Sequence, residues 1–481
     1  MTSIARAMTL ALGLAVLSAS VASAQESPLI EGPVRRFTAA PGFQVVIAHA
    51  EAAEGVEPRA IIGLYTRNGR TTESIPGYAH MSEHLFANSR SPIRDSTIPE
   101  GTEFLDSNAQ ARPDYVSAWI TVNRPDGSDA APVALALRYS ARIWDVDLNE
   151  TVFEEQRARV VAELTRGLPS GTFLSERALE HAFYGRLPEL EEEIALTQGY
   201  DYAHMLAYSR AIYQPEEMVL VIAGDIDVEA MESALRDHFA ARGEVVRKVT
   251  PDLETLLRPA QLAPYDGPVM RRSDVVEGDW VAAGIPAPPR ESSDYLAFLV
   301  LDQWLLGGRE DFTTLWSIRR SINSPLGEAL AASGPLDYLG DARGYGAASP
   351  PLAEGDPAYF TIQFGANEMD VEAAIQRFES AIAAIRQAPP SDEELLAARA
   401  QTIEFYRRWL NYDNLRPLSD HLAGMALNDP AGPERVMELH DKLASVTPED
   451  VRRVIDTYLT PGSFRYGTMS GAIVPPDTES Q

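Results

Sequence analysis

The sequence 208-YSRAIYQPEEMVLVIAGDID-227 contains the order of elements on which the fold depends. Its first part has the spacing of a helix, and Pro215 ends that helix because proline cannot donate the next backbone hydrogen bond. The apolar run at 218–224 then predicts a buried strand, which a Gly-Asp turn terminates. The stretch is therefore interpreted as helix, break, strand and turn.

A second stretch near the C-terminus, 447-TPEDVRRVIDTYLTPGSFRYGTMSGAI-473, has the same order. Thr447 has the position of a helix cap with Asp450 three residues on, Pro461 breaks the helix, and a strand follows. Tyr213 and Tyr458 occupy matching points in the two stretches. The repeat favours a duplicated domain, although helix, proline and strand is also a common order in α/β proteins.

The first half mixes strands and helices without strict βαβ alternation, which favours an α+β fold with a mainly antiparallel sheet. The expected strands are 43–50, 59–69, 114–123 and 218–224, and the expected helices are 77–89, 131–146 and 149–167. Four prolines punctuate residues 248–270 and predict an extended linker. We therefore expect two domains, at 33–247 and 271–475, each with a mainly antiparallel sheet packed against helices.

Residues 1–24 have the pattern of a cleavable secretory signal. A short start with Arg6 precedes an apolar run, and Ala22-Ser23-Ala24 places small residues before the expected cleavage site at Gln25. No later stretch reaches about 18 uninterrupted apolar residues, so no membrane span is expected. The mature protein is therefore expected to be periplasmic or secreted.

Charge and cysteine content narrow the possible partners and chemistry. The formal charge is −29, and removal of the signal leaves −30, which argues against nucleic acid or an anionic membrane as a partner. Basic or neutral peptides fit this charge better, and an acidic surface also serves solubility alone. The absence of cysteine restricts a metal site to histidine, carboxylate and backbone oxygen ligands.

The stretch 77-GYAHMSEHLFANSR-90 brings two histidines and a glutamate together. His80, Glu83 and His84 occupy positions i, i+3 and i+4, which share one face of a helix. Two imidazoles one turn apart can bind one Zn²⁺ at about 2.0–2.1 Å, and Glu83 is then placed to deprotonate a zinc-bound water. This is the H-x-x-E-H order; the alternative is a solvated helix that carries these side chains without a metal.

The stretch resembles the metal helix of the pitrilysin, insulysin and mitochondrial processing peptidase family of inverzincin zinc metallopeptidases. The preceding 67-RNGRTTESIPGYAH-80 is similar to that family's approach to the helix. The family takes a third ligand from a downstream helix, and 156-QRARVVAEL-164 supplies Glu163, 163 − 84 = 79 residues after His84. The resemblance thus implies one zinc per chain, bound by His80, His84 and Glu163, with one open position.

Other segments extend the resemblance over most of residues 33–235. The segment 107-SNAQARPDYVSAWITVN-123 resembles the family's asparagine–alanine segment, which implies that Asn108 helps hold the substrate backbone. The segment 182-AFYGR-186 and the tyrosine, proline, strand and Gly-Asp order ending at Asp227 are similar too. The second half matches in outline, which implies a C-terminal domain that repeats the fold without metal ligands.

The sequence departs from the family pattern at two places. Gln156 stands where the family has a glutamate, seven residues before the third ligand, and is expected to act beside the metal ligands without binding the metal. The family's C-terminal arginine and tyrosine, seven residues apart, align with Ala331 and Tyr338. Tyr338 is thus expected to contact substrate, and the arginine is missing; Arg343 and Tyr345 lie nearby at the wrong spacing.

These features predict an exported zinc-dependent endopeptidase for peptides or unfolded segments, with Glu83 activating a zinc-bound water. The missing arginine implies a homodimer, or a heterodimer with a related chain that supplies an arginine–tyrosine pair. One alternative is a non-catalytic subunit that binds peptides or stabilises a partner. Another is a structural metal site, which would have no use for a free Glu83.

Overall fold

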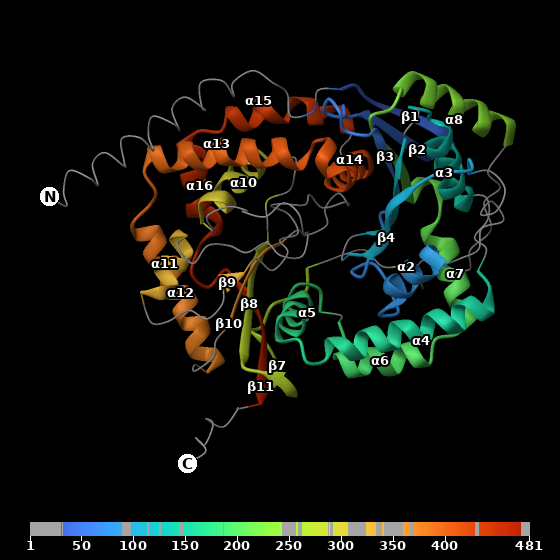
Figure 1. Ribbon diagram of the computed structural model, residues 1–481. Coiled ribbons are helices and arrows are strands. Elements are labelled where there is room, and N and C mark those ends of the chain that lie inside the picture. The colour runs from blue at the N-terminus through green and yellow to red at the C-terminus, as the bar shows by residue number, and fades with distance from the viewer. Residues whose placement is uncertain are drawn as a thin grey trace, which may run out of the picture.

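The structure is a computed structural model and is an α+β fold with two β-sheets (Figure 1). It describes residues 30, 32–88, 98–112, 115–124, 127–143, 148–185, 187–242, 256–257, 262–286, 288, 292–305, 324–332, 339–340, 359–365, 370–428 and 432–472. The predicted signal at 1–24, most of the predicted linker, and Tyr338, Arg343 and Tyr345 lie outside these residues.

The first sheet has six strands in the order β1-β2-β6-β3-β5-β4. Its neighbours are antiparallel except for β2 and β6, which run parallel. The strands are β1 (Val34–Ala40), β2 (Phe43–His49), β3 (Arg59–Thr66), β4 (Phe104–Ala111), β5 (Val116–Asn123) and β6 (Met218–Gly224). Because β6 is buried along its whole length at the centre of the sheet, it reads as an apolar run without alternation.

The second sheet has five strands in the order β7-β11-β8-β10-β9. Strands β7 and β11 are parallel, and the other neighbouring pairs are antiparallel. The strands are β7 (Val269–Glu277), β8 (Asp279–Pro286), β9 (Leu339–Gly340), β10 (Tyr359–Gly365) and β11 (Arg465–Ala472). Strand β7 begins inside the predicted linker 248–270, directly after its last proline, Pro268.

The two sheets have the same topology apart from the extra edge strand β1. In the first sheet β6 lies between β2, to which it is parallel, and β3, to which it is antiparallel. In the second sheet β11 lies in the same way between β7 and β8. The edge strands β4 and β9 also correspond in position. This correspondence confirms the predicted duplicated fold with mainly antiparallel sheets, each packed against helices.

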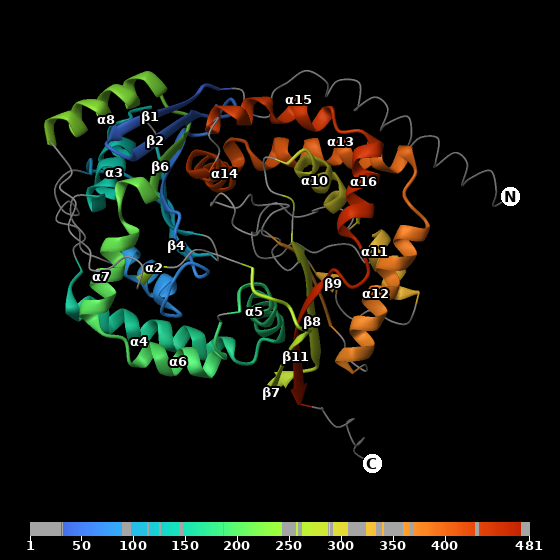
Figure 2. The same ribbon diagram turned by 180° about the vertical axis from the view of Figure 1, so that it is seen from behind.

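Helices cover the sheets and form the outer layers of both halves (Figures 1 and 2). Those of the N-terminal half are α2 (Tyr78–Asn88), α3 (Ala130–Ser140), α4 (Glu150–Gly167), α5 (Gly171–Tyr184), α6 (Leu190–Gln198), α7 (Tyr202–Ile212) and α8 (Val228–Arg242). Those of the C-terminal half are α10 (Asp294–Leu305), α11 (Pro325–Ala331), α12 (Val371–Gln387), α13 (Asp392–Trp409), α14 (Leu415–Asn428), α15 (Leu439–Ala444) and α16 (Pro448–Tyr458). None of the helices in the described part of the chain has the length and apolar character that a membrane crossing requires.

Two helices are exchanged between the halves. Helix α5 of the N-terminal half packs against β11, β8 and β7 of the second sheet, and α14 of the C-terminal half packs against β6, β3 and β2 of the first (Figure 1). Gly467 in β11 permits the first contact, because a Cβ there would lie 1.9 Å from the backbone nitrogen of Leu179. Each core therefore includes side chains from both halves, so the halves cannot separate without exposing apolar surface.

Local signals in the sequence explain several element boundaries. Asn149 caps α4 by accepting hydrogen bonds from the backbone of Thr151 and Val152. Thr447 and Asp450 form the predicted capping box at the start of α16. Strands β1 and β4, by contrast, have no counterpart in the elements expected from sequence. Both are edge strands, and β4 is exposed at five of its eight positions, so it lacks the apolar run that marks a buried strand.

Candidate functional site

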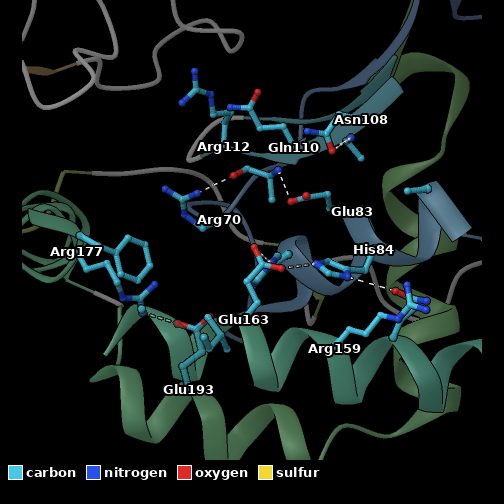
Figure 3. A pocket seen from close by; sticks show the side chains of 18 of the residues that line it. Arg70, Glu83, His84, Asn108, Gln110, Arg112, Arg159, Glu163, Arg177 and Glu193 are labelled. Atoms are coloured by element: carbon cyan, nitrogen blue, oxygen red, sulfur yellow. Dashed lines mark hydrogen bonds and ion pairs between the residues drawn. The ribbon is translucent and has the colours of Figure 1, made fainter. Parts of the chain in front are cut away.

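The predicted site lies where α2 packs across α4 (Figure 3). His80 and His84 project from one face of α2, and Glu163 reaches them from α4. His84 Nε2 lies 3.2 Å from Glu163 Oε2, and His80 Nε2 lies 3.9 Å from Glu163 Oε1. The structure thus brings together three residues that are up to 83 positions apart, 163 − 80, in the chain.

These three side chains have a geometry that suits a metal ion. One ligand atom from each lies within 4.8 Å of the others. Ligands about 2.0–2.1 Å from one tetrahedral ion lie roughly 3.3 Å apart, so small side-chain shifts would bring all three into range. Two neutral imidazoles and a carboxylate are a typical set for catalytic zinc, which leaves a fourth position open.

The pKa values around the site reflect burial and close charge. Burial lowers the pKa of the His80 imidazole, which favours the neutral form that binds metals. Burial also acts to lower the pKa of His84, but the hydrogen bond to Glu163 and the charge of Glu83 outweigh it and raise that pKa. The same hydrogen bond lowers the pKa of Glu163, which keeps its carboxylate ionised as a ligand must be.

Gln156 orients the His84 ring through Nδ1, the nitrogen that does not face Glu163. Its Oε1 lies 3.3 Å from His84 Nδ1 and also accepts a hydrogen bond of 3.2 Å from Asn88 Nδ2. An amide oxygen accepts and does not donate, so this contact keeps a proton on Nδ1. Nε2, whose proton is shared with Glu163, is then the nitrogen that would exchange its proton for a metal ion. Gln156 is only 2% exposed. A neutral side chain therefore occupies the buried position where the family that the sequence resembles has a charged glutamate.

Glu83 lies beside the two histidines and opens on the same cavity. Its Oε2 accepts a hydrogen bond of 2.7 Å from the backbone N–H of Ala111, at the end of edge strand β4. The cavity has a volume of about 660 Å³, and Figure 3 shows its lining. His80, His84, Glu163, Gln156 and Asn108 also line this cavity. A carboxylate held at the metal-binding face, next to a strand edge, is placed to take a proton from water near a bound peptide.

Glu73 anchors the N-terminus of α2 and was not identified from sequence. Its two oxygens accept hydrogen bonds from the backbone N–H groups of Gly77, at 2.6 Å, and Ala79, at 2.5 Å. These donors belong to the first turn of a helix, which attracts negative charge. A glutamate four residues before a helix-opening glycine is the sequence signal that could have indicated this cap.

The buried Glu73 carboxyl should make stability depend on pH. Burial raises its pKa from 4.5 to about 8, against the opposing effect of its two backbone hydrogen bonds. The folded state therefore holds the proton more tightly, so the stabilisation is complete below about pH 4.5 and is lost as the pH rises through about 8. The quantity to follow is the free energy of unfolding of the wild type minus that of Glu73→Gln. We expect this difference to fall by a few kcal/mol as the pH rises from about 5 to about 9, since each pKa unit corresponds to about 1.4 kcal/mol. Urea denaturation at both pH values measures it; a constant difference would contradict this origin.

Gly77 is required by the turn that leads into α2. Its φ is +85°, and a Cβ there would lie 2.2 Å from the hydroxyl oxygen of Tyr200. We expect Gly77→Ala to lower the free energy of unfolding by about 2–4 kcal/mol, because backbone strain and a steric clash act together. The matched control is Gly55→Ala, where φ is +81° and no atom lies within 4 Å, with an expected loss of about 1 kcal/mol. Equal losses in a denaturation experiment would show that the Tyr200 contact has no effect.

Asn108 lies on the exposed part of β4 and lines the cavity. Its Oδ1 accepts a hydrogen bond of 2.9 Å from the backbone N–H of Ala109. Strand β4 is the edge of its sheet, next to β5, so one side of its backbone faces away from the sheet. Asn108 is therefore placed where an extended peptide could pair with the strand.

The C-terminal positions that the resemblance connects with substrate are placed only in part. Ala331 is exposed at the last residue of α11, and it has no side chain that could reach a substrate. Tyr338, Arg343 and Tyr345 lie outside the residues that the structure describes. The predicted role of Tyr338 therefore stays a prediction.

A partly buried ion pair in the lining of the same cavity was not predicted from the sequence either. Arg70 donates to Glu180 Oε1 at 2.5 Å and to the backbone oxygen of Ala111 at 2.7 Å. Glu180 belongs to α5, the helix that packs on the second sheet. The pair links this exchanged helix to the end of β4, a long-range contact for which the sequence carries no local signal.

The sequence matches one protein-family model and one curated relative. A family model described as the peptidase M16 inactive domain matches residues 200–402. This segment does not include His80, Glu83, His84 or Glu163, so the description does not concern the candidate site. An uncharacterized zinc protease of Mycobacterium leprae is 25% identical over 215 residues, which cover 44% of this chain and 46% of that protein. The chain thus matches about half the length of this curated relative.

Solved structures share the fold over nearly the whole chain. A protease from Helicobacter pylori is 17% identical with a TM-score of 0.68, and the match covers 91% of this chain and 100% of that one. A chain described as a putative M16-like peptidase from Alicyclobacillus acidocaldarius is 15% identical with a TM-score of 0.65, and the match covers 92% of this chain and 99% of that one. A peptidase M16 inactive domain from Pseudomonas fluorescens is 15% identical with a TM-score of 0.63, covering 92% and 98%. The family model therefore relates residues 200–402 to M16 peptidases, and the solved structures show that the chain shares their fold.

Proposed function

We propose that this chain is an exported zinc-dependent endopeptidase that hydrolyses peptides or unfolded protein segments. The observation that carries the proposal is the convergence of His80, His84 and Glu163, with Glu83 beside them in one cavity. A structural metal site would not need a carboxylate that is left over beside the three ligands. The relationship to M16 peptidases and to a zinc protease supports the same reaction class.

His80, His84 and Glu163 are the residues that would hold the zinc. When bound, zinc polarises the scissile carbonyl and lowers the pKa of water. Glu83 accepts a proton from water as general base and then delivers it to the leaving amine. The hydrogen bond from Ala111 to Oε2 fixes the Glu83 carboxylate, and its other oxygen is available to hold that proton.

The peptide would bind as an added strand along β4. This strand is at the sheet edge, and its exposed residues run toward Ala111, whose N–H contacts Glu83. Backbone hydrogen bonds give affinity with little demand on side-chain sequence, which suits unfolded segments. Asn108 is proposed to hold the substrate backbone.

The small side chain at Ala331 motivates a second subunit. The exposed methyl group there cannot stabilise negative charge on a substrate. We propose a homodimer, or a heterodimer in which a related chain supplies an arginine–tyrosine pair, in the periplasm or outside the cell. The same observation favours a second candidate, a non-catalytic subunit that binds peptides.

Hydrolysis of a quenched fluorescent peptide by the purified full chain tests the proposal. We expect cleavage that a chelator abolishes and that added zinc restores. The assay is run with the chain alone and with the product of any adjacent related gene. Peptide binding without cleavage in every combination would favour the non-catalytic subunit instead.

A further inference from the structure

Arg416 belongs to α14 and reaches the candidate site from the C-terminal half. Its guanidinium lies over the Trp119 ring, 3.3 Å from the ring centroid. Its Nη2 donates to Gln110 Oε1 and to Ser117 Oγ, each at 3.3 Å. Gln110 and Trp119 both line the cavity, so Arg416 contacts two of its lining residues.

The contacts of Arg416 bridge the last two strands of the first sheet. Gln110 of β4 and Ser117 of β5 are directly paired across the two strands, and both accept from the same nitrogen. Trp119 adds a second connection, because its indole N–H donates to Asp106 Oδ2 of β4 at 3.2 Å. The guanidinium therefore contacts, directly or through Trp119, both ends of the segment that contains Asn108.

Arg416 is itself held firmly. Asp420, one helical turn further on α14, accepts from its Nε at 3.0 Å and lies 2.9 Å from its Nη2. The Arg416 side chain is 10% exposed, so these charge-assisted contacts lie out of reach of most solvent. Tyr65 of β3 donates a 2.8 Å hydrogen bond to Ser419, which fastens the same turn of α14 to the sheet.

We infer that Arg416 is a positioning residue through which the C-terminal half holds edge strand β4 in register with Glu83. The next residue after Gln110 is Ala111, whose N–H donates to Glu83 Oε2 at 2.7 Å. A strand that shifts at Gln110 also shifts this N–H and the row of backbone groups that a peptide would meet. The inference rests on the proposed peptidase function, and it assigns to the exchanged helix α14 a part in substrate binding.

The test uses the zinc-loaded full chain with Arg416→Lys, Gln110→Ala and the double variant. Lysine keeps the charge beside Asp420 but cannot form the planar contact with Trp119 and Gln110 together. We expect each single variant to raise KM for a peptide about tenfold, the effect of losing one charge-assisted hydrogen bond, with kcat changed by less than about threefold. Because both residues act through one contact, the double variant should be no worse than the more affected single variant.

A matched control separates positioning from general destabilisation. Arg399→Lys changes an arginine of α13 that donates to Val446 within the C-terminal half, and it should leave KM unchanged. Zinc content should be equal in all variants. The inference would be overturned by an unchanged KM in Arg416→Lys. It would also be overturned if the increase in KM of the double variant were the product of the two single increases. If Arg416→Lys does not fold, the KM of Gln110→Ala is the deciding measurement.

A second readout does not depend on hydrolysis. Amide hydrogen exchange of residues 108–111 should be about tenfold faster in Arg416→Lys and Gln110→Ala than in wild type, while β3 and β6 keep their protection. Unchanged exchange at these amides would overturn the inference even if the wild-type chain cleaves peptides. If wild type cleaves nothing but exchange accelerates as expected, the proposed function fails and the role of Arg416 in holding β4 stands.

Discussion

Glu83→Gln should lower kcat for peptide hydrolysis by about 10²–10⁴-fold, which is the usual effect of removing a general base. Glutamine has nearly the same shape and still accepts the hydrogen bond from the Ala111 N–H through its amide oxygen. It cannot take a proton from water, so the loss should appear in kcat, while KM and zinc content stay close to wild type. Steady-state kinetics with a fluorescent peptide, together with metal analysis of the same samples, provide the measurement.

The matched control is Glu176→Gln, which removes another carboxylate from the wall of the same cavity. Glu176 belongs to α5, and it is not one of the four residues that form the candidate site. We expect kcat within about threefold of wild type, since a charge that does not touch the reacting atoms acts weakly through solvent. Equal losses in both variants would indicate a general effect of cavity charge and would contradict the role of Glu83 as base.

The second large effect is expected from Glu163→Gln, which should weaken zinc binding by at least about 10³-fold. The amide is a much poorer ligand than the carboxylate, and the variant leaves two histidines that lie one turn apart on α2. The hydrogen bond that connects Glu163 to His84 also changes, so the imidazole loses its charged neighbour. Competition with a fluorescent zinc chelator at fixed pH measures the affinity.

Gln156→Ala supplies a graded comparison for the same titration. Gln156 contacts His84 Nδ1 at 3.3 Å but is not placed to touch the metal. Removing such a partner should weaken zinc binding about 10–100-fold, clearly less than the loss of a ligand. If Gln156→Ala equals Glu163→Gln, or if neither changes the affinity, the proposed ligand set is wrong.

Part of the candidate site could be predicted because three of its side chains are close together in the sequence, at the spacing of one helix face. His80, Glu83 and His84 lie within five residues, and helical periodicity alone places them on one face. The approach of Glu163 is a tertiary contact, which the sequence could indicate only through the resemblance of its helix to a known family. The structure places all four residues in the lining of one cavity.

What the sequence did not predict depends on contacts between distant segments. Strand β4 has mostly exposed side chains, so its pairing with β5 carries no apolar signature. Glu73, Arg70 and Arg416 act through burial and partners that are set by tertiary packing. The exchange of α5 and α14 between the halves has the same origin, because helix periodicity shows which face is apolar but not which sheet will cover it.

Titration of metal-free protein with zinc, followed by binding and hydrolysis in parallel, is the most direct test of a zinc peptidase site at His80, His84 and Glu163. Wild type and Glu83→Gln should each bind about one equivalent of zinc, the number that one three-ligand site accommodates. Wild type alone should regain peptide hydrolysis, in proportion to the zinc bound. Failure of wild type to bind zinc, or equal hydrolysis by Glu83→Gln, would contradict this assignment.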